Sequence, residues 1–335
     1  MRKYQYFYAA LMVAALVIVV AGVFAVLRPP ALKPVPEVPL APGGQMPQPI
    51  PGVPLFDAGK YKTEPMVSVW LADRGYVENM PLEHYLEGVV AQEMDVGWPQ
   101  EALRAQAIAS RTLTISASEA GAIRHRHGAD VSTAKDELQA YAPEKVNENV
   151  RQAVRSTRGQ ILLYAGSLVN AIYSASNGQI AATKEEAFPR EIPQPTPYFQ
   201  PVTDNSFRYT PAQIQSWSVS IPAQEVAATV GYSGNPGDIA ILEKGPSGRI
   251  LSIGAGDKKM TGADFRKAVG YDRLWSTLIT SMTYDGGQFT FQGSGWGNGV
   301  GLCQWGAYAY ARDGLKAEDI LRHYYVGAEI RKLWE

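Results

Sequence analysis

A glutamate on the apolar face of a predicted helix is the strongest chemical feature of this sequence. The helix begins with apolar residues at the spacing of one buried stripe: Leu82, Tyr85, Leu86, Val89 and Val90. Glu93 continues this series and projects within about 20° of Leu82 at 3.6 residues per turn. Glu83 and Glu87 fall off the apolar face, so we expect both to be solvated.

A carboxyl group in an apolar setting must be protonated or paired, because an unpaired buried charge costs several kcal/mol. Desolvation moves a glutamate pKa from about 4.3 towards roughly 6, the range that suits a general acid near neutral pH. Glu93 is therefore our candidate acid. A buried ion pair or a helix cap is the alternative that its position leaves open.

Two arginines on the next predicted helix are candidate ligand-binding residues. Pro99 followed by Glu101 predicts a helix start, and the alanine-rich run continues to about residue 118 and ends near Gly121. Arg104 and Arg111 lie seven residues apart, hence on one face. Guanidinium groups bind anionic or carbonyl-rich ligands through paired hydrogen bonds. A solvated arginine face is the alternative interpretation.

Three runs in this region carry a family resemblance: YLEGVVAQEM at 85–94, WPQEALRAQA at 98–107 and ASRT at 109–112. They resemble the signature of the stage II sporulation protein D family, which includes related amidase-enhancer proteins of bacterial cell walls. In that family the glutamate matching Glu93 is the catalytic acid of a peptidoglycan lytic transglycosylase. The residues matching Arg104 and Arg111 are implicated in activity.

The resemblance implies a substrate and a biological setting. The substrate is the glycan strand of peptidoglycan, stripped of its stem peptides and cut to 1,6-anhydro-muramyl ends. The setting is degradation of the septal wall during engulfment in sporulation, beside an amidase or endopeptidase partner and a membrane anchor protein. We expect no cofactor and no metal. Zinc occurs in some members of the family near the segment that holds His125 and His127, but this chain has no cysteine there.

Two further segments supply candidate substrate-binding residues. A predicted strand at 168–174 runs into a loop that carries Tyr173 and Ser176, whose hydroxyls are suited to hydrogen bonds with a sugar. The loop resembles the substrate-contacting segment of the family. A second motif, GSGWGNGVGLCQWGA at 293–307, has five glycines at alternate positions and Gln304, and it also resembles the family pattern. It lacks the Gly-Lys-Ser/Thr of a phosphate-binding loop.

Two other functions stay open at this point. Cys303 follows the glycine loop at a predicted helix start, where thiolates are stabilised, and His323 could complete a Cys-His peptidase. A non-catalytic module that binds the wall or enhances an amidase is the other alternative. A single carboxylic acid favours the transglycosylase over a hydrolase, because most glycoside hydrolases use two carboxyl groups.

The amino-terminal part predicts a membrane anchor and a tether. Residues 7–27 carry no charge and are long enough to cross a bilayer, with Arg2 and Lys3 before them. We therefore expect a single-pass protein with a cytoplasmic amino terminus in residues 1–28 and an extracytoplasmic domain. Residues 29–65 predict a linker, since ten prolines fall between Pro29 and Pro54.

Residues 66–335 predict one catalytic domain, of one or two subdomains, with a mixed α+β fold around a central groove. The net charge of −1 and the lack of a basic cluster exclude a nucleic-acid partner.

Helices are expected at 146–157, 223–230, 308–312 and 317–325. A loop is expected at 124–128. Strands are expected at 67–71, 160–164, 216–221, 238–244 and 328–333, with a hairpin at 282–291.

Overall fold

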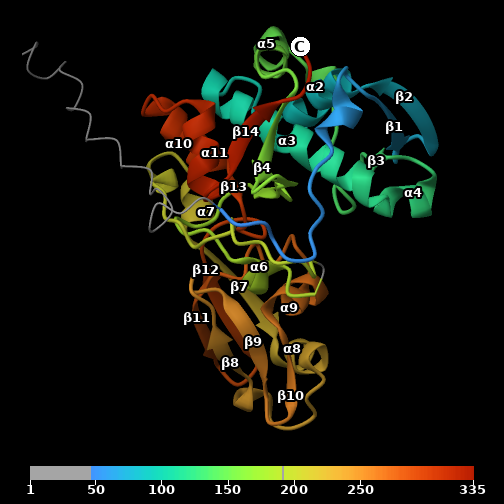
Figure 1. Ribbon diagram of the computed structural model, residues 1–335. Coiled ribbons are helices and arrows are strands. Elements are labelled where there is room, and N and C mark those ends of the chain that lie inside the picture. The colour runs from blue at the N-terminus through green and yellow to red at the C-terminus, as the bar shows by residue number, and fades with distance from the viewer. Residues whose placement is uncertain (1–46, 191) are drawn as a thin grey trace, which may run out of the picture. The chain divides into compact units, whose positions relative to one another are not determined.

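The architecture is that of a computed structural model, which describes residues 47–190 and 192–335 (Figure 1). The expected membrane helix at 7–27 and the first part of the proline-rich stretch lie outside these residues. None of the helices in the described ranges is long and apolar enough to cross a membrane. Contacts of the folded domain start inside the stretch expected to be linker. Ile50 is buried, and the Phe56 N–H donates to the Gly166 carbonyl at 2.9 Å.

The first hydrophobic core is built around the helix α3 (Gln100–Ala120). The preceding helix and three helices from later in the chain pack against it: α2 (Leu82–Glu93), α5 (Glu148–Ser156), α10 (Gln304–Arg312) and α11 (Ala317–Tyr324) (Figure 1). Four alanines of α3 are buried and leave room for close approach of these neighbours: Ala102, Ala105, Ala107 and Ala109. The helix ends at Gly121, which adopts a left-handed conformation (φ 69°) that glycine tolerates. Both predicted helices of this region are confirmed.

Three small sheets complete the first core. In one, β1 (Met66–Leu71) pairs with β2 (Tyr76–Pro81) and β3 (Val131–Ser132). In another, β4 (Gln160–Tyr164) lies between β14 (Glu329–Lys332) and β5 (Ser167–Leu168). The third pairs β6 (Tyr173–Ser174) with β13 (Leu302–Cys303) in parallel. The single strand expected at 168–174 was wrong, because its two ends pair with different partners in different sheets.

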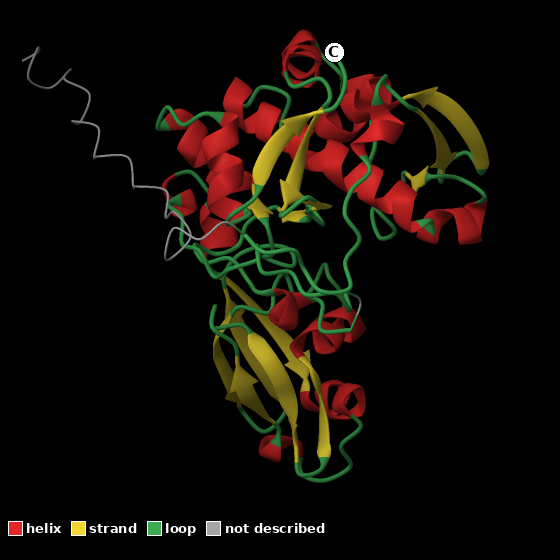
Figure 2. Ribbon diagram, viewed as in Figure 1, coloured by secondary structure: helices red, strands yellow, loops and turns green. Residues whose placement is uncertain are grey.

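A second hydrophobic core is formed by residues between Trp217 and Phe291. One sheet has the order β11 (Ile279–Tyr284), β12 (Gln288–Gly293) and β7 (Trp217–Pro222). The other has the order β10 (Lys258–Thr261), β9 (Ile250–Ala255) and β8 (Ala240–Lys244), and the helices α8 (Ala223–Val230) and α9 (Gly262–Val269) pack beside the strands (Figure 2). The helix predicted at 223–230 and the hairpin at 282–291 are confirmed, as is the α+β class.

Buried polar contacts join the two cores. Arg249, which follows β8, is fully buried and donates to the carbonyls of Asn177 (2.7 Å) and Ile180 (2.9 Å). Glu186 accepts a 2.7 Å hydrogen bond from the Ser247 hydroxyl.

Shorter helices lie in the connections: α4 (Ala122–His127), α6 (Lys184–Ala187), α7 (Ala212–Gln215), η1 (Ala58–Tyr61), η2 (Pro143–Lys145), η3 (Ser206–Arg208) and η4 (Pro236–Asp238). The loop expected at 124–128 is therefore helical over most of its length.

Candidate active site

Glu93 is the last residue of α2, and its side chain is partly buried. The backbone N–H of Ala140 donates a hydrogen bond of 2.9 Å to its Oε1. The chain turns away after Glu93, since Met94 has an extended conformation (φ −129°, ψ 157°). The carboxyl group is therefore held at a helix end by a donor from a distant loop.

The electrostatic setting of Glu93 favours its protonated form. Burial raises the pKa of this carboxyl above its usual value. Hydrogen bonds from the Ala140 N–H and from the side chains of Tyr173 and Gln304 act in the opposite direction, but burial is the larger effect. A carboxylic acid with a raised pKa that also has hydrogen-bond donors for its anion can give up a proton and take it back.

Strand pairing brings Tyr173 and Gln304 to the same carboxyl group. Tyr173 lies in β6, and Gln304 directly follows β13 as the first residue of α10. The parallel pairing of these strands aligns Tyr173 with Leu302. Two segments that were singled out separately from the sequence therefore both approach Glu93.

A buried amide orients the tyrosine. Gln139, which is 1% exposed, donates from Nε2 to the Tyr173 hydroxyl at 3.0 Å. Its Oε1 accepts from the Thr114 hydroxyl at 2.9 Å. Burial first, and then the Glu93 charge, raise the pKa of Tyr173 well above its usual value. Tyr173 therefore keeps its proton and can donate it in a hydrogen bond.

A second buried amide, that of Gln106, supports Gln304. The Gln304 Nε2 donates to the Oε1 of Gln106 at 3.4 Å, and the Nε2 of Gln106 donates to the Ser110 hydroxyl at 3.0 Å. Neither Gln106 nor Gln139 was singled out from the sequence. The available signal for Gln106 was its place among the small residues of an alanine-rich helix, where a buried amide requires partners.

Arg104 forms ion pairs within the protein. Its guanidinium contacts Glu101 at 2.9 Å and Glu318 of α11 at 3.1 Å, and its side chain is 20% exposed. These pairs tie the start of α3 to α11. Arg104 is thus partly accessible, and its charge is already balanced by two carboxylates.

Arg111 is fully buried and paired with Glu83. Its Nη2 lies 2.6 Å from Glu83 Oε2 and its Nε lies 3.0 Å from Oε1, a bidentate pair between α3 and α2. Nη1 also donates to the carbonyl of Gln160 at 3.1 Å. The expectation that Glu83 is solvated was wrong, because it neutralises Arg111 inside the core. This conformation gives Arg111 no surface with which to contact a sugar.

Ser176 is buried in a backbone bridge. Its N–H donates to the Trp296 carbonyl at 2.9 Å and its carbonyl accepts from the Trp296 N–H at 2.8 Å. The Ser176 hydroxyl accepts from the Gly178 N–H at 3.4 Å. The serine therefore fixes the loop that follows Tyr173 and exposes no hydroxyl to a ligand, contrary to the expected sugar contact.

Cys303 and His323 lack the geometry of a catalytic pair. Cys303 is fully buried, and its Sγ accepts from the Gly306 N–H at 3.2 Å as the cap of α10. Burial and the nearby charge of Asp204 raise the pKa of this thiol well above its usual value. The His323 Nε2 lies 3.0 Å from the Thr203 carbonyl, and burial lowers its pKa. Neither group is poised to form a thiolate-imidazolium pair.

His127, one of the two histidines near residue 125, has ordinary partners. His127 Nε2 lies 2.9 Å from Glu137, and its ring stacks on Trp70 with centroids 4.7 Å apart.

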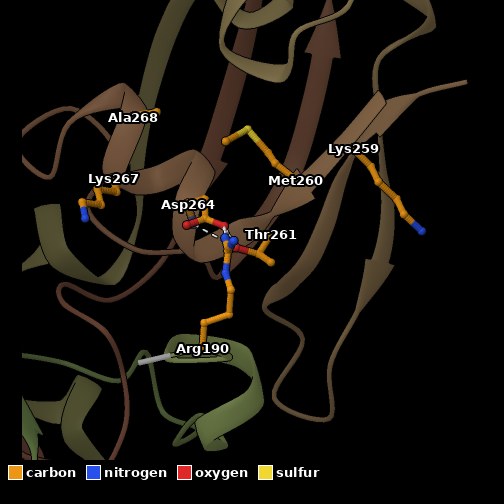
Figure 3. A pocket seen from close by; sticks show the side chains of 7 residues that line it. All are labelled: Arg190, Lys259, Met260, Thr261, Asp264, Lys267 and Ala268. Atoms are coloured by element: carbon orange, nitrogen blue, oxygen red, sulfur yellow. Dashed lines mark hydrogen bonds and ion pairs between the residues drawn. The ribbon is translucent and has the colours of Figure 1, made fainter. Parts of the chain in front are cut away.

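A surface hollow elsewhere is lined by side chains of α9 and β10 together with Arg190: Lys259, Met260, Thr261, Asp264, Lys267 and Ala268 (Figure 3). Arg190 and Asp264 form an ion pair across it. The hollow shares no residue with the Glu93 site.

Comparison with known proteins assigns the chain to a family. The family model described as SpoIID, stage II sporulation protein, matches residues 72–164, which include Glu93, Arg104 and Arg111. The stage II sporulation protein D of Bacillus amyloliquefaciens is 31% identical over 279 residues, covering 79% of this chain and 78% of the relative. The chain belongs to the stage II sporulation protein D family.

Two further relatives support the assignment to this family. The stage II sporulation protein D of Bacillus subtilis is 27% identical over 266 residues, with 76% of this chain and 75% of the relative covered. An amidase enhancer of the same organism is 25% identical over 294 residues, with 73% of this chain and 40% of the enhancer covered. The resemblance seen in the sequence motifs is thus confirmed over most of the chain.

Proposed function

We propose that this member of the stage II sporulation protein D family is a lytic transglycosylase that cuts the glycan strands of peptidoglycan. One observation carries the proposal. Glu93 is a partly buried carboxyl with a raised pKa, and its hydrogen-bond partners are an amide, a tyrosine and a glutamine. Such a group can act first as an acid and then as a base in the same reaction.

The proposed reaction has two proton transfers and one ring closure. Protonated Glu93 donates its proton to the glycosidic oxygen as the bond between that oxygen and C1 of the muramic acid breaks. The Glu93 carboxylate then takes the proton of the muramic 6-hydroxyl while O6 bonds to C1. The product is a 1,6-anhydro end. The attacking hydroxyl belongs to the same sugar, so proximity favours the closure and no water is consumed.

The neighbours of Glu93 suit this sequence of steps. Hydrogen bonds from Ala140, Tyr173 and Gln304 stabilise the carboxylate that forms when the proton leaves. None of these three groups is a second carboxyl, which most hydrolytic glycosidases use to activate water. The arrangement therefore favours intramolecular attack over hydrolysis.

The remaining predicted residues receive different roles in this proposal. Arg104 stays a candidate for contact with the lactyl carboxylate of muramic acid, because its side chain is partly exposed at the start of α3. Arg111 supports the site from within, since its pairing with Glu83 joins α2 to α3. Ser176 fixes the backbone beyond Tyr173.

The biological setting belongs to the same proposal. We place the protein at the cell membrane, held by an anchor at residues 7–27 with its catalytic domain outside. It acts on glycan stripped of stem peptides during septal wall degradation in engulfment. An amidase or endopeptidase that removes the stem peptides, and a membrane anchor protein, are its proposed partners. The similarity to an amidase enhancer supports the link to an amidase.

The experiment that tests the function is digestion of peptide-free glycan strands by the full-length protein, with mass spectrometry of the muramyl ends. We expect anhydro ends from the parent and from Glu87→Gln, a matched control on the same helix that pairs with His84 and Arg151. The cutting rate of Glu93→Gln should be about 10²–10⁴-fold lower than that of the parent, which is the usual contribution of a general acid. An unchanged rate in Glu93→Gln rules out the assignment.

A non-catalytic, amidase-enhancing scaffold is the second candidate, favoured by the amidase-enhancer similarity. It predicts that the parent binds glycan strands, leaves them uncut and stimulates an added amidase. Under this alternative, Glu93→Gln and the parent stimulate the amidase equally.

A further inference from the structure

Trp296 is an exposed aromatic side chain in the glycine-rich motif. It is 46% exposed, and its ring stacks on Trp275 with centroids 5.5 Å apart and planes 28° apart. Trp275 is partly buried, and its Nε1 donates to the Asp272 carbonyl at 3.1 Å. One face of Trp296 is thus covered by a second, fixed indole while much of the ring remains in contact with solvent.

The backbone around Trp296 is held on both sides. Trp296 exchanges two hydrogen bonds with Ser176, and the Gly297 N–H donates to the Trp275 carbonyl at 2.9 Å. Gly295 (φ 78°) and Gly297 (φ 113°) flank it in conformations that other residues rarely adopt. The indole is therefore presented by a rigid loop, and little conformational freedom is lost when a ligand binds it.

The same loop is bonded to the segment that carries Tyr173. Asn298 Nδ2 donates to the Tyr173 carbonyl at 3.3 Å, and Ser176, three residues beyond Tyr173, forms the bridge to Trp296. Three residues span at most about 10 Å of backbone. Trp296 is therefore attached within a short distance of the tyrosine whose hydroxyl contacts Glu93.

Other exposed aromatic side chains differ from Trp296 in these respects. Tyr271 has the Arg266 guanidinium over its ring at 4.6 Å, and Tyr284 belongs to the β11–β12 hairpin and packs on Phe289. Single exposed apolar residues are common on protein surfaces and carry no information. The stacked pair, the rigid loop and the link to Tyr173 together distinguish Trp296.

We propose that Trp296, backed by Trp275, is a stacking platform for a sugar ring of the glycan strand, beside the sugars that react at Glu93. The C–H groups on the face of a pyranose ring carry partial positive charge, and the face of an indole is negative. A flat platform near the site would hold a long strand in register without hydrogen bonds to a particular substituent. This inference rests on the proposed function of the Glu93 site.

The test measures binding of peptide-free glycan strands to the full-length protein in a Glu93→Gln background, which prevents turnover. We expect Trp296→Ala to weaken binding roughly tenfold, equivalent to about 1.4 kcal/mol. Trp296→Phe keeps an aromatic face and should retain most of the affinity, whereas Trp296→Leu should lose it. Tyr76→Ala on β2 removes an aromatic residue that is also 46% exposed and should bind like the parent.

The effects of the Trp296 variants on binding and cutting distinguish a stacking platform from a purely structural role of Trp296. They also distinguish failure of the platform from failure of the proposed function. In the active protein, Trp296→Leu should raise KM for long strands and leave kcat nearly unchanged. Equal affinity of the Phe and Leu variants overturns the platform, and so does parental affinity in Trp296→Ala. If the parent neither binds nor cuts glycan, the proposed function fails and the platform with it. If the parent cuts and the Trp296 variants match it, only the platform fails.

Discussion

The Ala140 N–H donates a 2.9 Å hydrogen bond to the Glu93 carboxyl across 47 residues of sequence. The contact is possible because the loop that contains Ala140 is bonded to the body of α2: the Ala142 N–H donates to the Gly88 carbonyl at 3.0 Å. Tyr141, between them, stacks on Tyr85 with centroids 5.6 Å apart. The orientation of the candidate acid thus depends on how this loop packs on the helix.

The raised pKa of Glu93 predicts an activity that falls on the alkaline side. Only the protonated carboxyl can donate to the glycosidic oxygen, so kcat/KM should decline as pH rises through the raised pKa. The measurement is initial rate against pH with peptide-free strands. A rate that rises over the same range would point to a group that must lose its proton first.

The same pKa shift predicts how Glu93→Gln affects stability. A carboxyl whose pKa is higher in the folded state contributes stability below its unfolded pKa and loses that contribution as pH rises through the folded pKa. Glu93→Gln should therefore be at least as stable as the parent at neutral pH, and its advantage should vanish in acid. Melting temperatures over a pH series provide the check, with Glu87→Gln as the control.

Tyr173→Phe should move the alkaline limb of the activity profile upward in pH. Its hydroxyl donates to the carboxylate form of Glu93 and lowers the pKa of that group, so removing it raises this pKa further. The maximal rate should also fall, because the carboxylate loses one donor. An alkaline limb at the parental pH would show that the Tyr173 hydroxyl does not affect the ionisation of Glu93.

The Glu83–Arg111 pair predicts a large and non-additive loss of stability. Arg111→Ala leaves the Glu83 carboxylate buried without its partner, which costs about 3–5 kcal/mol. Replacing both residues, as Glu83→Gln with Arg111→Ala, should cost much less than the sum of the two single changes. Urea unfolding of the four proteins gives the coupling energy.

Parental stability of the Arg111→Ala protein would contradict the structural role of Arg111. If Arg111→Ala unfolds at the parental urea concentration but loses activity, Arg111 acts on the substrate, as first expected from its spacing to Arg104, and the buried pair is not what holds α2 to α3.

Gly88→Ala should destabilise the domain although alanine favours helices. A Cβ at this position lies 2.2 Å from the Tyr141 ring, so the ring or the loop must move. We expect a net loss of about 1–3 kcal/mol, typical of overpacking. Activity should fall too, because the shift carries Ala140 away from Glu93. Gly287→Ala, whose Cβ would meet nothing nearer than 3.7 Å, serves as the control.

Cys303→Ala should keep wall-cutting activity and lose about 1 kcal/mol of stability, the usual value of a helix cap. A thiol alkylator should modify Cys303 only after unfolding, since the side chain is fully buried. Loss of activity on alkylation of the folded protein, with Glu93→Gln still active, would favour the peptidase instead.

Local sequence patterns predicted much of the secondary structure. The apolar stripe of α2 and the glycine after α3 predicted two helices that the structure contains, and α8 has the predicted bounds. These features depend on neighbours within a few residues, such as helical spacing, a cap or a turn. Glu93 could be singled out for the same reason, because its place on the stripe is a local property.

Pairings between distant segments were decided by the tertiary structure alone. The apolar stripe of α2 predicted a single buried face, but α2 packs against both α3 and α5, which places Glu83 inside beside Arg111. The predicted strand at 168–174 divides because Tyr173 pairs with Leu302, far along the chain. Charge partners and strand partners at this separation leave no trace in a single sequence, since only the folded chain brings them within hydrogen-bonding distance.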